Sequence, residues 1–292
     1  MNNDVLSNNT VNHIKTEHIE YLQFRKLQKY NNIISHGYSV GIDKNFRTFR
    51  SNREPLSNNE YENSMNNYKQ FCKQIGADYK NIIKANQAHT DNVVSIDEIN
   101  TNNTIDTKIL SDGLITNKRG IVLATTNADC ILLLFFDPVK KIIANTHSGW
   151  KGTIQEISIK TVEKMINIYG CNPKDIIVCI CPSIRKCHFE VGEDVKEMFY
   201  KQFKKLGNTD EFIFNRHEKW YVDTVYINKM LLKGMGILED NIEDSGICSV
   251  CNSNIIHSYR VEGKDYGLAT ALIGLRWLFY NLNNELKLWI FN

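Results

Sequence analysis

Two short apolar runs with a polar break between them occupy the middle of the chain and predict a pair of adjacent strands. The runs cover residues 131–136 and 141–146, and Asp137 and Pro138 lie between them. An Asp-Pro pair between hydrophobic runs is typical of a turn. The pattern therefore predicts two strands that follow one another directly in space.

The outer ends of these two runs carry residues that could do chemistry. Cys130 stands where the first run begins, and His147 stands where the second run ends. If the strands pair antiparallel, their outer ends meet and the thiol comes close to the imidazole. The turn Ser-Gly-Trp-Lys-Gly at 148–152 follows and is expected to open an amphipathic helix. A thiol and an imidazole at one sheet edge, beside the start of a helix, indicate a functional site.

Apolar residues that recur every three or four positions predict helices elsewhere in the chain. In one such stretch Tyr61, Met65 and Tyr68 share a face, and Gly76 follows as a stop. The predicted helices cover residues 59–75, 153–169, 191–203 and 225–235. Further strands are expected twice within 19–40 and at 81–88, 93–96, 114–116, 121–126, 176–181, 220–222 and 255–259. The apolar segment 269–279 fits neither pattern well enough to be assigned.

These elements predict a single α/β domain with mixed β-sheets and with helices packed outside them. The domain is expected to cover residues 19–292, because no internal repeat and no long Pro-, Gly- or Ser-rich linker divides the chain. Residues 1–18 are rich in Asn and other polar groups, which favours a poorly ordered N-terminus.

Composition is that of an ordinary globular protein that works inside the cell. The chain has 292 residues, of which 42% are hydrophobic and 23% charged, and its net charge of +2 gives no reason to expect nucleic-acid or membrane binding. The apolar runs are far shorter than the roughly 20 residues that cross a bilayer. The polar N-terminus lacks a signal-peptide core, and the eight cysteines are expected to be reduced thiols in the cytoplasm.

Three residues at predicted strand ends could together bind a metal ion. Thiolate and imidazole are the ligands that Zn²⁺ favours, and a set of His89, Cys130 and His147 would leave a fourth position for water or substrate. The three lie far apart in the chain, so no compact motif supports the site. From the spacing alone, a buried structural cysteine with two structural histidines is the favoured interpretation. A third is a catalytic pair, because a nearby imidazole lowers the pKa of a thiol.

Four motifs in the chain resemble those of the multicopper polyphenol oxidoreductase family, also called the laccase-domain or YfiH-type family. The motifs are QAH at 87–89, ADC at 128–130, HSGWKG at 147–152 and SYR at 258–260. Weaker agreement occurs at 112–116 and 182–184, and the resemblance covers roughly residues 34 to 275. It implies the layered α/β fold of that family.

The resemblance also implies a function. Members of the family are understood as zinc-dependent purine nucleoside enzymes, and their zinc ligands fall on His89, Cys130 and His147. The implied reactions are phosphorolysis of adenosine, inosine or methylthioadenosine and deamination of adenosine. Thr90 and Cys181 replace glycines of the family pattern, and the glycine-rich signature near 41–49 is poorly kept. These departures bear on substrate preference more than on the metal.

Other residues are candidates for substrate binding and proton transfer. Phosphorolysis needs a cation to hold phosphate, for which Arg260 and Arg50 are the candidates, and Gln87 stands beside the metal motif. Asp129 could act as the acid/base group next to Cys130, although an acidic neighbour of a metal ligand is often structural. The expected partners are therefore a small-molecule nucleoside and phosphate, and the sequence does not indicate an oligomeric state.

Of three rival functions, polyphenol oxidation is rejected as the main function and the other two remain open. A multicopper oxidase needs many more histidines than the eight present, so oxidation of polyphenols is expected at most as a side reaction of copper bound in vitro. Cys130 could instead be the nucleophile of a hydrolase with His147 as its base, acting on cell-wall precursor peptides. A binding protein without catalysis that keeps the fold is the third.

One further cysteine motif calls for interpretation. Cys248 and Cys251 form a C-x-x-C, but no second C-x-x-C or histidine pair accompanies them in the sequence. We therefore expect two free thiols there. Cys179 and Cys181 share one strand face, so packing is expected to explain them.

Overall fold

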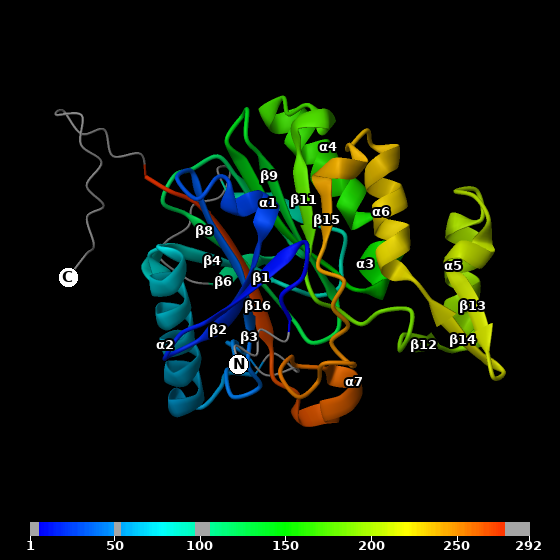
Figure 1. The fold of residues 1–292 in the computed structure, drawn as a ribbon, viewed down its shortest axis with the longest axis horizontal. Helices are drawn as coiled ribbons and strands as arrows, with labels where there is room; N and C mark the ends of the chain where they lie inside the picture. Colours follow the sequence, from blue (N-terminus) through cyan, green and yellow to red (C-terminus); the bar gives the residue numbers. More distant parts are fainter. Residues whose placement is uncertain (1–5, 50–53, 97–105, 278–292) are drawn as a thin grey trace.

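The computed structural model describes residues 6–49, 54–96 and 106–277 (Figure 1). Most of the strands form two sheets. The order of the seven-stranded sheet is β1 (Val11–Lys15), β2 (Glu20–Phe24), β3 (Ile34–Val40), β16 (Ala269–Leu275), β8 (Val122–Asn127), β4 (Ile82–Asn86) and β6 (Asp106–Leu110). The order of the six-stranded sheet is β15 (Ile242–Asp244), β11 (Ile177–Ile180), β9 (Ile131–Asp137), β10 (Ile142–Ser148), β7 (Gly113–Thr116) and β5 (Val93–Ser95).

Helices lie over the outer faces of both large sheets, and a small third sheet with a helix of its own stands to one side (Figure 1). The third sheet has the order β12 (Glu190–Val191), β14 (Lys219–Val222) and β13 (Ile213–Arg216). The helices are α1 (Arg25–Gln28), α2 (Asn58–Ile75), α3 (Trp150–Ile154), α4 (Ile157–Tyr169), α5 (Glu193–Phe203), α6 (Thr224–Gly234) and α7 (Tyr259–Glu262). The described fold is thus mixed α/β, as the sequence predicts.

The alternation of side chains along β9 explains the layers. Leu132, Leu134 and Phe136 point into the core between the two large sheets. Leu133 and Phe135 point the other way and pack with residues of α4 and α6. A strand that is covered on both faces needs an unbroken apolar sequence, which is why β9 reads as a continuous hydrophobic run.

Helix α2 covers the outer face of the seven-stranded sheet. It begins with a capping box, in which the Ser57 side chain accepts the Glu60 amide and the Glu60 carboxylate accepts the Ser57 amide. Its apolar face buries Tyr68 and Phe71 against the sheet. Gly76 ends the helix in the left-handed conformation with φ 68°, as the predicted stop requires.

The two central strands pair in the register that the sequence predicts. In β9 and β10, His147 lies opposite Leu132 and Ser148 lies opposite Ile131. Cys130, which immediately precedes β9, therefore lies at the same end of the sheet as His147. The predicted meeting of the two outer ends is confirmed.

A buried asparagine joins the two large sheets just before this end. Asn145 lies in β10, and its side-chain amide donates to the carbonyl oxygens of Leu123 in β8 (3.0 Å) and Ala271 in β16 (2.8 Å). Its side-chain oxygen accepts the Thr125 hydroxyl at 2.5 Å. Residues two apart in a strand point to the same face, so His147, like Asn145, points toward the seven-stranded sheet.

Several predicted elements differ from the structure. The helix expected over 153–169 is two helices, because Glu156 adopts a left-handed conformation with φ 59° between α3 and α4. This break lets α3 contact α5 and α6 while α4 packs on the six-stranded sheet. The strand expected at 255–259 is wrong, since turns lead there into α7. The unassigned segment 269–279 contributes the interior strand β16.

The N-terminal segment also differs from the expectation. Residues 11–15, expected to be poorly ordered, form β1 and pair antiparallel with β2. Their alternating pattern buries Val11 and His13, which a simple count of polar residues does not reveal. None of the helices in the described ranges is long and apolar enough to cross a membrane.

The contact between the sheets gives a stability prediction. Asn145→Ala removes three buried hydrogen bonds that join the sheets and leaves space where the amide packed, so we expect the free energy of unfolding to fall by about 2–4 kcal/mol. Thr125→Val, which removes one hydroxyl donor, should cost about 1–2 kcal/mol. Urea denaturation measures both values. A loss below about 0.5 kcal/mol for Asn145→Ala would show that this residue does not hold the sheets together.

Candidate metal centre

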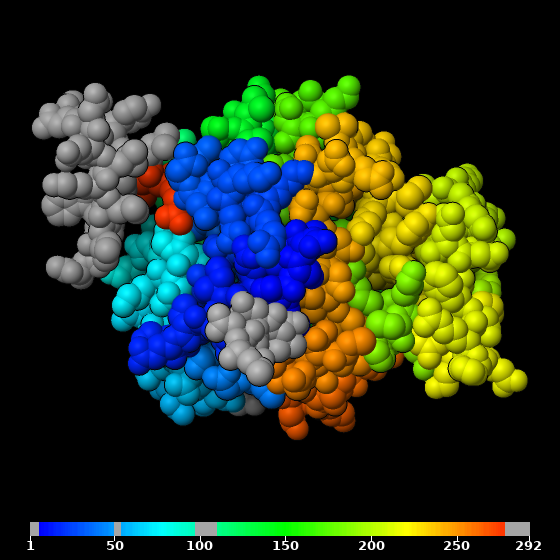
Figure 2. Space-filling model, in the orientation of Figure 1, coloured from blue at the N-terminus to red at the C-terminus, as the bar shows by residue number. Residues whose placement is uncertain are grey.

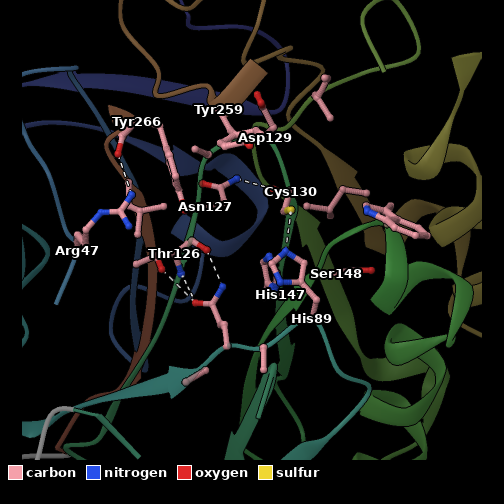
Figure 3. Close-up of a pocket in the computed structure, with 18 of the residues that line it drawn as sticks. Arg47, His89, Thr126, Asn127, Asp129, Cys130, His147, Ser148, Tyr259 and Tyr266 are labelled. Carbon is pink, nitrogen blue, oxygen red and sulfur yellow. Dashed lines mark hydrogen bonds between the residues drawn. The ribbon is translucent and has the colours of Figure 1, made fainter. Parts of the chain in front are cut away.

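His89, Cys130 and His147 converge at one end of the two large sheets (Figure 3). His89 follows β4, and Cys130 lies between β8 and β9, so the parallel pairing of β4 with β8 brings the two together. The Cys130 sulfur lies 3.9 Å from the Nε2 atom of His89. One ligand atom from each of the three residues lies within 4.8 Å of the others. The structure thus brings together all three predicted metal ligands.

These separations fit a shared metal ion. Zn–S and Zn–N bond lengths place a sulfur and a nitrogen of one tetrahedral site roughly 3.5 Å apart. The observed 3.9 Å between the Cys130 sulfur and the His89 nitrogen is close to that value. The His89 and His147 rings meet edge to face with centroids 4.9 Å apart, so both can turn a nitrogen toward the same point.

Asp112 fixes both histidines and is a functional residue that the sequence analysis missed. Its carboxylate accepts the backbone amides of Ala88, His89 and Thr90 at 2.7–3.1 Å. These bonds hold His89 in a left-handed conformation, with φ 58°. The carboxylate also accepts the Thr90 hydroxyl at 2.7 Å and lies 2.8 Å from the Nδ1 atom of His147. A carboxylate on Nδ1 leaves Nε2 to face a metal, which is a common arrangement around metal-binding histidines.

The charges of the centre support one another. Burial alone would raise the pKa of the Asp112 carboxyl, but the hydrogen bonds from His147 and Thr90 lower it to about 2. Burial likewise opposes ionisation of Cys130, yet the two neighbouring histidines lower the pKa of its thiol to about 6. The Cys130 thiolate and Asp112 in turn raise the pKa of His147 against the effect of burial. The thiolate is the form of cysteine that binds metals and acts as a nucleophile.

Gly149 packs directly over the three ligands. A Cβ atom at this position would lie 2.8 Å from the His89 ring, 3.2 Å from the Cys130 sulfur and 3.4 Å from the His147 ring. The backbone φ at Gly149 is −65°, so the space and not the conformation demands glycine. The motif glycine is therefore a condition for the three ligands to meet.

The ligands line one side of a pocket of about 800 Å³. This volume lies within the range of small-molecule sites. Across the pocket in Figure 3, the Arg47 guanidinium lies 4.3 Å from the ring centre of Tyr266 and donates to its carbonyl oxygen. Tyr266 also meets Tyr259 edge to face at 5.1 Å. Lys84 from β4 adds a second cationic group to the lining and contacts the Thr48 hydroxyl at 3.0 Å.

The predicted substrate residues fall at different places. Arg260 lines the pocket, and its guanidinium donates to the carbonyl oxygens of His188 and Glu190, each at 3.1 Å. The Gln87 side chain also lines the pocket and bonds to the backbone of Thr126 as acceptor and donor, at 2.8 and 2.7 Å. Arg50 lies outside the described residues.

Asp129 lies beside Cys130 with its carboxylate fully engaged. One oxygen accepts the hydroxyls of Ser249 and Ser258 at 2.6 and 2.8 Å. The other accepts the backbone amide of Arg260 at 2.7 Å. Its backbone is left-handed, with φ 83°. The observed contacts are those of a residue that anchors the segment carrying Arg260, and its role as an acid/base group stays a prediction.

The pocket residues missed in the sequence have no local signature. Arg47 lies in a turn-rich stretch, Lys84 looks like a strand residue, and Tyr266 follows a short turn. Only Tyr259 could have been found, since it is the middle residue of the SYR motif. Asp112 lies next to a glycine, where it reads as a turn residue.

Comparison with known proteins places these features in a family context. A family model described as multi-copper polyphenol oxidoreductase laccase matches residues 44–276. A protein named purine nucleoside phosphorylase LACC1 from Mus musculus is 36% identical over 172 residues, which cover 56% of this chain and 38% of that protein. Purine nucleoside phosphorylase YlmD of Bacillus subtilis is 30% identical over 57% of this chain and 59% of its own length.

Two further matches extend the comparison. A protein named adenosine deaminase RL5, from an unknown prokaryotic organism, is 32% identical over 66% of this chain and 75% of its own length. The crystal structure of the Bacillus licheniformis hypothetical protein YfiH superposes with a TM-score of 0.77, at 22% identity, and covers 92% of this chain and all of that one. The structural match supports the fold. The chain spans only 38% of the LACC1 relative and 59% of the YlmD relative.

The packing of Gly149 gives a test of the centre. We expect Gly149→Ala to lose the metal of this centre, so that bound metal falls by about one ion per chain, because the added methyl pushes the two rings and the sulfur apart. Gly152→Ala is the matched control, since its added methyl would find its nearest neighbour at 3.4 Å, an ordinary contact. Elemental analysis after gel filtration measures the metal, and thermal unfolding confirms folding. Equal metal content in the two variants would contradict the proposed geometry.

Proposed function

The chain belongs to the multi-copper polyphenol oxidoreductase laccase family, whose model matches residues 44–276, and from this premise we propose that it is a zinc-dependent purine nucleoside enzyme. The proposed reactions are phosphorolysis of adenosine, inosine or methylthioadenosine and deamination of adenosine. The names of the relatives, purine nucleoside phosphorylase and adenosine deaminase, support this reading. We also keep the prediction of a single catalytic domain acting in the cytoplasm, and we extend its predicted start at residue 19 to include β1.

The observation that carries the proposal is the convergence of His89, Cys130 and His147 on one side of a pocket of about 800 Å³. Three protein ligands beside an open cavity are typical of catalytic zinc, whereas structural zinc usually has four. Zinc held there would supply a Lewis acid and lower the pKa of a bound water to about 7. Copper could occupy the same ligands in vitro.

The residues around the ligands have definite tasks in this proposal. Asp112 fixes the orientation of His147 through Nδ1 and holds the backbone turn at His89. Cys130 enters as a thiolate because the two imidazoles stabilise its charge. The rings of Tyr259 and Tyr266, which meet edge to face, offer apolar surface to the purine base.

Phosphate needs a positive side of the same pocket. Arg260 stays our principal candidate, and its two bonds to backbone carbonyl oxygens hold the guanidinium at the pocket rim. Arg47 and Lys84 add positive charge to the lining, and Arg50 stays a candidate for the same role. Gln87 serves in this view to tie the end of β4 to β8 and so to place His89, in addition to any contact with substrate.

Asp129 keeps its predicted role as a candidate acid/base group, with a second task that its contacts suggest. Three donors surround its carboxylate, including the backbone amide of Arg260. Loss of this carboxylate would therefore move Arg260 as well as remove a proton acceptor.

The rival functions fit the same residues less well. Within the described ranges, two groups of residues could hold a metal: the three pocket ligands, and a second group of Cys187, His188, Cys248 and Cys251. Neither group contains more than two histidines, whereas a multicopper oxidase needs many. A Cys130 hydrolase would use the same lowered thiol pKa, but it gives no reason for His89 to approach the sulfur. A hydrolase of that kind should keep its activity in a zinc chelator, while the zinc enzyme should lose it.

The first test joins metal content to turnover. We expect Cys130→Ser to lose the zinc of this centre and to lower kcat/KM for adenosine by at least a hundredfold, about 2.7 kcal/mol in transition-state stabilisation. Cys171→Ser is the matched control, because Cys171 is a buried cysteine outside both candidate metal groups. Chromatography of adenosine with and without phosphate follows both reactions. Full turnover by Cys130→Ser would refute the proposed centre.

The second test concerns phosphate. We expect Arg260→Ala to raise the KM for phosphate by roughly 10- to 100-fold, since a charge-assisted hydrogen bond contributes about 1.5–3 kcal/mol. Deamination, which does not use phosphate, should be affected far less. Arg216→Ala, at an exposed arginine on β13, is the control. An unchanged KM for phosphate would remove Arg260 from the phosphate site.

A further inference from the structure

A second group of metal-binding side chains lies outside the pocket. Cys187 and His188 come from the loop between β11 and β12, and Cys248 and Cys251 come from the turns before α7. One ligand atom from each of the four lies within 4.8 Å of the others. The sequence analysis predicted free thiols here, because nothing in the order of residues shows that the two segments meet.

The distances within this group match a closed tetrahedral site. Bond lengths of zinc place two sulfurs roughly 3.8 Å apart, and a sulfur and a nitrogen roughly 3.5 Å apart. The sulfurs of Cys187 and Cys251 lie 3.9 Å apart. The Nδ1 atom of His188 lies 3.2, 3.6 and 3.5 Å from the sulfurs of Cys187, Cys248 and Cys251. All four distances are therefore close to those between the ligand atoms of one tetrahedral zinc site.

The backbone brings the two segments together independently of the thiols. Ser183 and Cys248 form a parallel bridge, in which the Ser249 amide donates to the Ser183 carbonyl oxygen at 3.0 Å. The Asn252 amide donates to the Cys248 carbonyl oxygen, which makes the C-x-x-C segment a tight turn. In Figure 2 the light-green segment leading to β12 lies against the orange segment leading to α7.

We propose that Cys187, His188, Cys248 and Cys251 bind a structural zinc ion that is separate from the candidate catalytic centre. Four protein ligands leave no position for substrate, which distinguishes this site from the three-ligand set in the pocket. A disulfide between Cys187 and Cys251 is the other use of two nearby thiols. It would need the sulfurs about 2.05 Å apart and would leave a thiol and an imidazole of the group without a role.

Charge around the group supports the zinc. Three thiolates, a neutral imidazole and a dication carry one net negative charge. The Arg260 guanidinium lies 3.1 Å from the carbonyl oxygen of His188, next to that charge. The positive charge of Arg260 therefore lies beside His188, one of the four proposed zinc ligands, and offsets the negative charge of the site.

The position of the site explains what such an ion would do. The first segment carries Ile184 and Phe189 and the second leads to Tyr259 and Arg260, and all four line the pocket. A zinc ion joining the segments would hold this rim in place. The site therefore positions substrate-binding residues and takes no part in the chemistry.

Metal content of the intact chain tests the proposal, with variants at the exposed thiols Cys187 and Cys251. Wild type purified under reducing conditions should hold two zinc ions per chain. Cys187→Ser and Cys251→Ser should each hold one zinc ion and melt at a lower temperature than wild type. If the site bound no metal, replacing either exposed thiol should leave the melting temperature unchanged. Cys171→Ser should keep both ions.

Cobalt separates the two sites. In Cys130→Ser, which lacks the sulfur of the pocket centre, added Co²⁺ should still give the strong visible and thiolate-to-cobalt bands of a tetrahedral site with three sulfurs. These bands should vanish when Cys251→Ser is added. Cys130→Ser protein without such bands, or unchanged zinc in Cys251→Ser, would overturn the proposal, as would a Cys187–Cys251 disulfide found by mass spectrometry in the reduced preparation. Two zinc ions in Cys130→Ser would instead contradict the pocket centre.

Discussion

The antiparallel pairing of β9 with β10 is the constraint on which the centre depends. Its register places Ser148 opposite Ile131, so the residues that flank this pair, Cys130 and His147, share one end of the sheet. A slip of one residue would turn every side chain of a strand to the opposite face. Both faces of β9 are packed against apolar layers. Such a slip would therefore misplace the residues of the centre and those of the core at the same time.

A single buried carboxylate converts this arrangement into a metal-binding geometry. Asp112 joins the loop after β4 to the end of β10, because it accepts three backbone amides around His89 and contacts the ring of His147. The strands bring the ligands near one another, and Asp112 sets their direction. Gly149 then leaves room for the sulfur and the two rings to meet.

The sequence predicts what depends on local pattern. The strands β9 and β10 and helix α2 with its stop at Gly76 could be recognised in this way. The three ligands could be assigned because their motifs resemble those of the family. The break at Glu156 could not, because it follows from how α3 and α4 pack on different neighbours. Strand β16 was also missed, since its place between β3 and β8 is fixed by tertiary pairing.

The contacts between distant segments were the hardest to foresee. Arg47, Lys84 and Tyr266 join the pocket from three parts of the chain. Cys187 and Cys251 meet only because the bridge between Ser183 and Cys248 aligns their segments. Hydrogen bonds from Ser249 and Arg260 to Asp129 link that second group to the residue beside Cys130. The two candidate metal groups thus support the same wall of the pocket.

Anomalous diffraction at the zinc edge tests the central claim most directly. Crystals of the wild-type chain, grown without chelator, should show an anomalous peak within bonding distance of His89, Cys130 and His147, roughly 2.0–2.3 Å from each ligand atom. A map with full-strength ligands and no anomalous peak among them, or with the Cys130 sulfur turned away from both rings, would contradict the account.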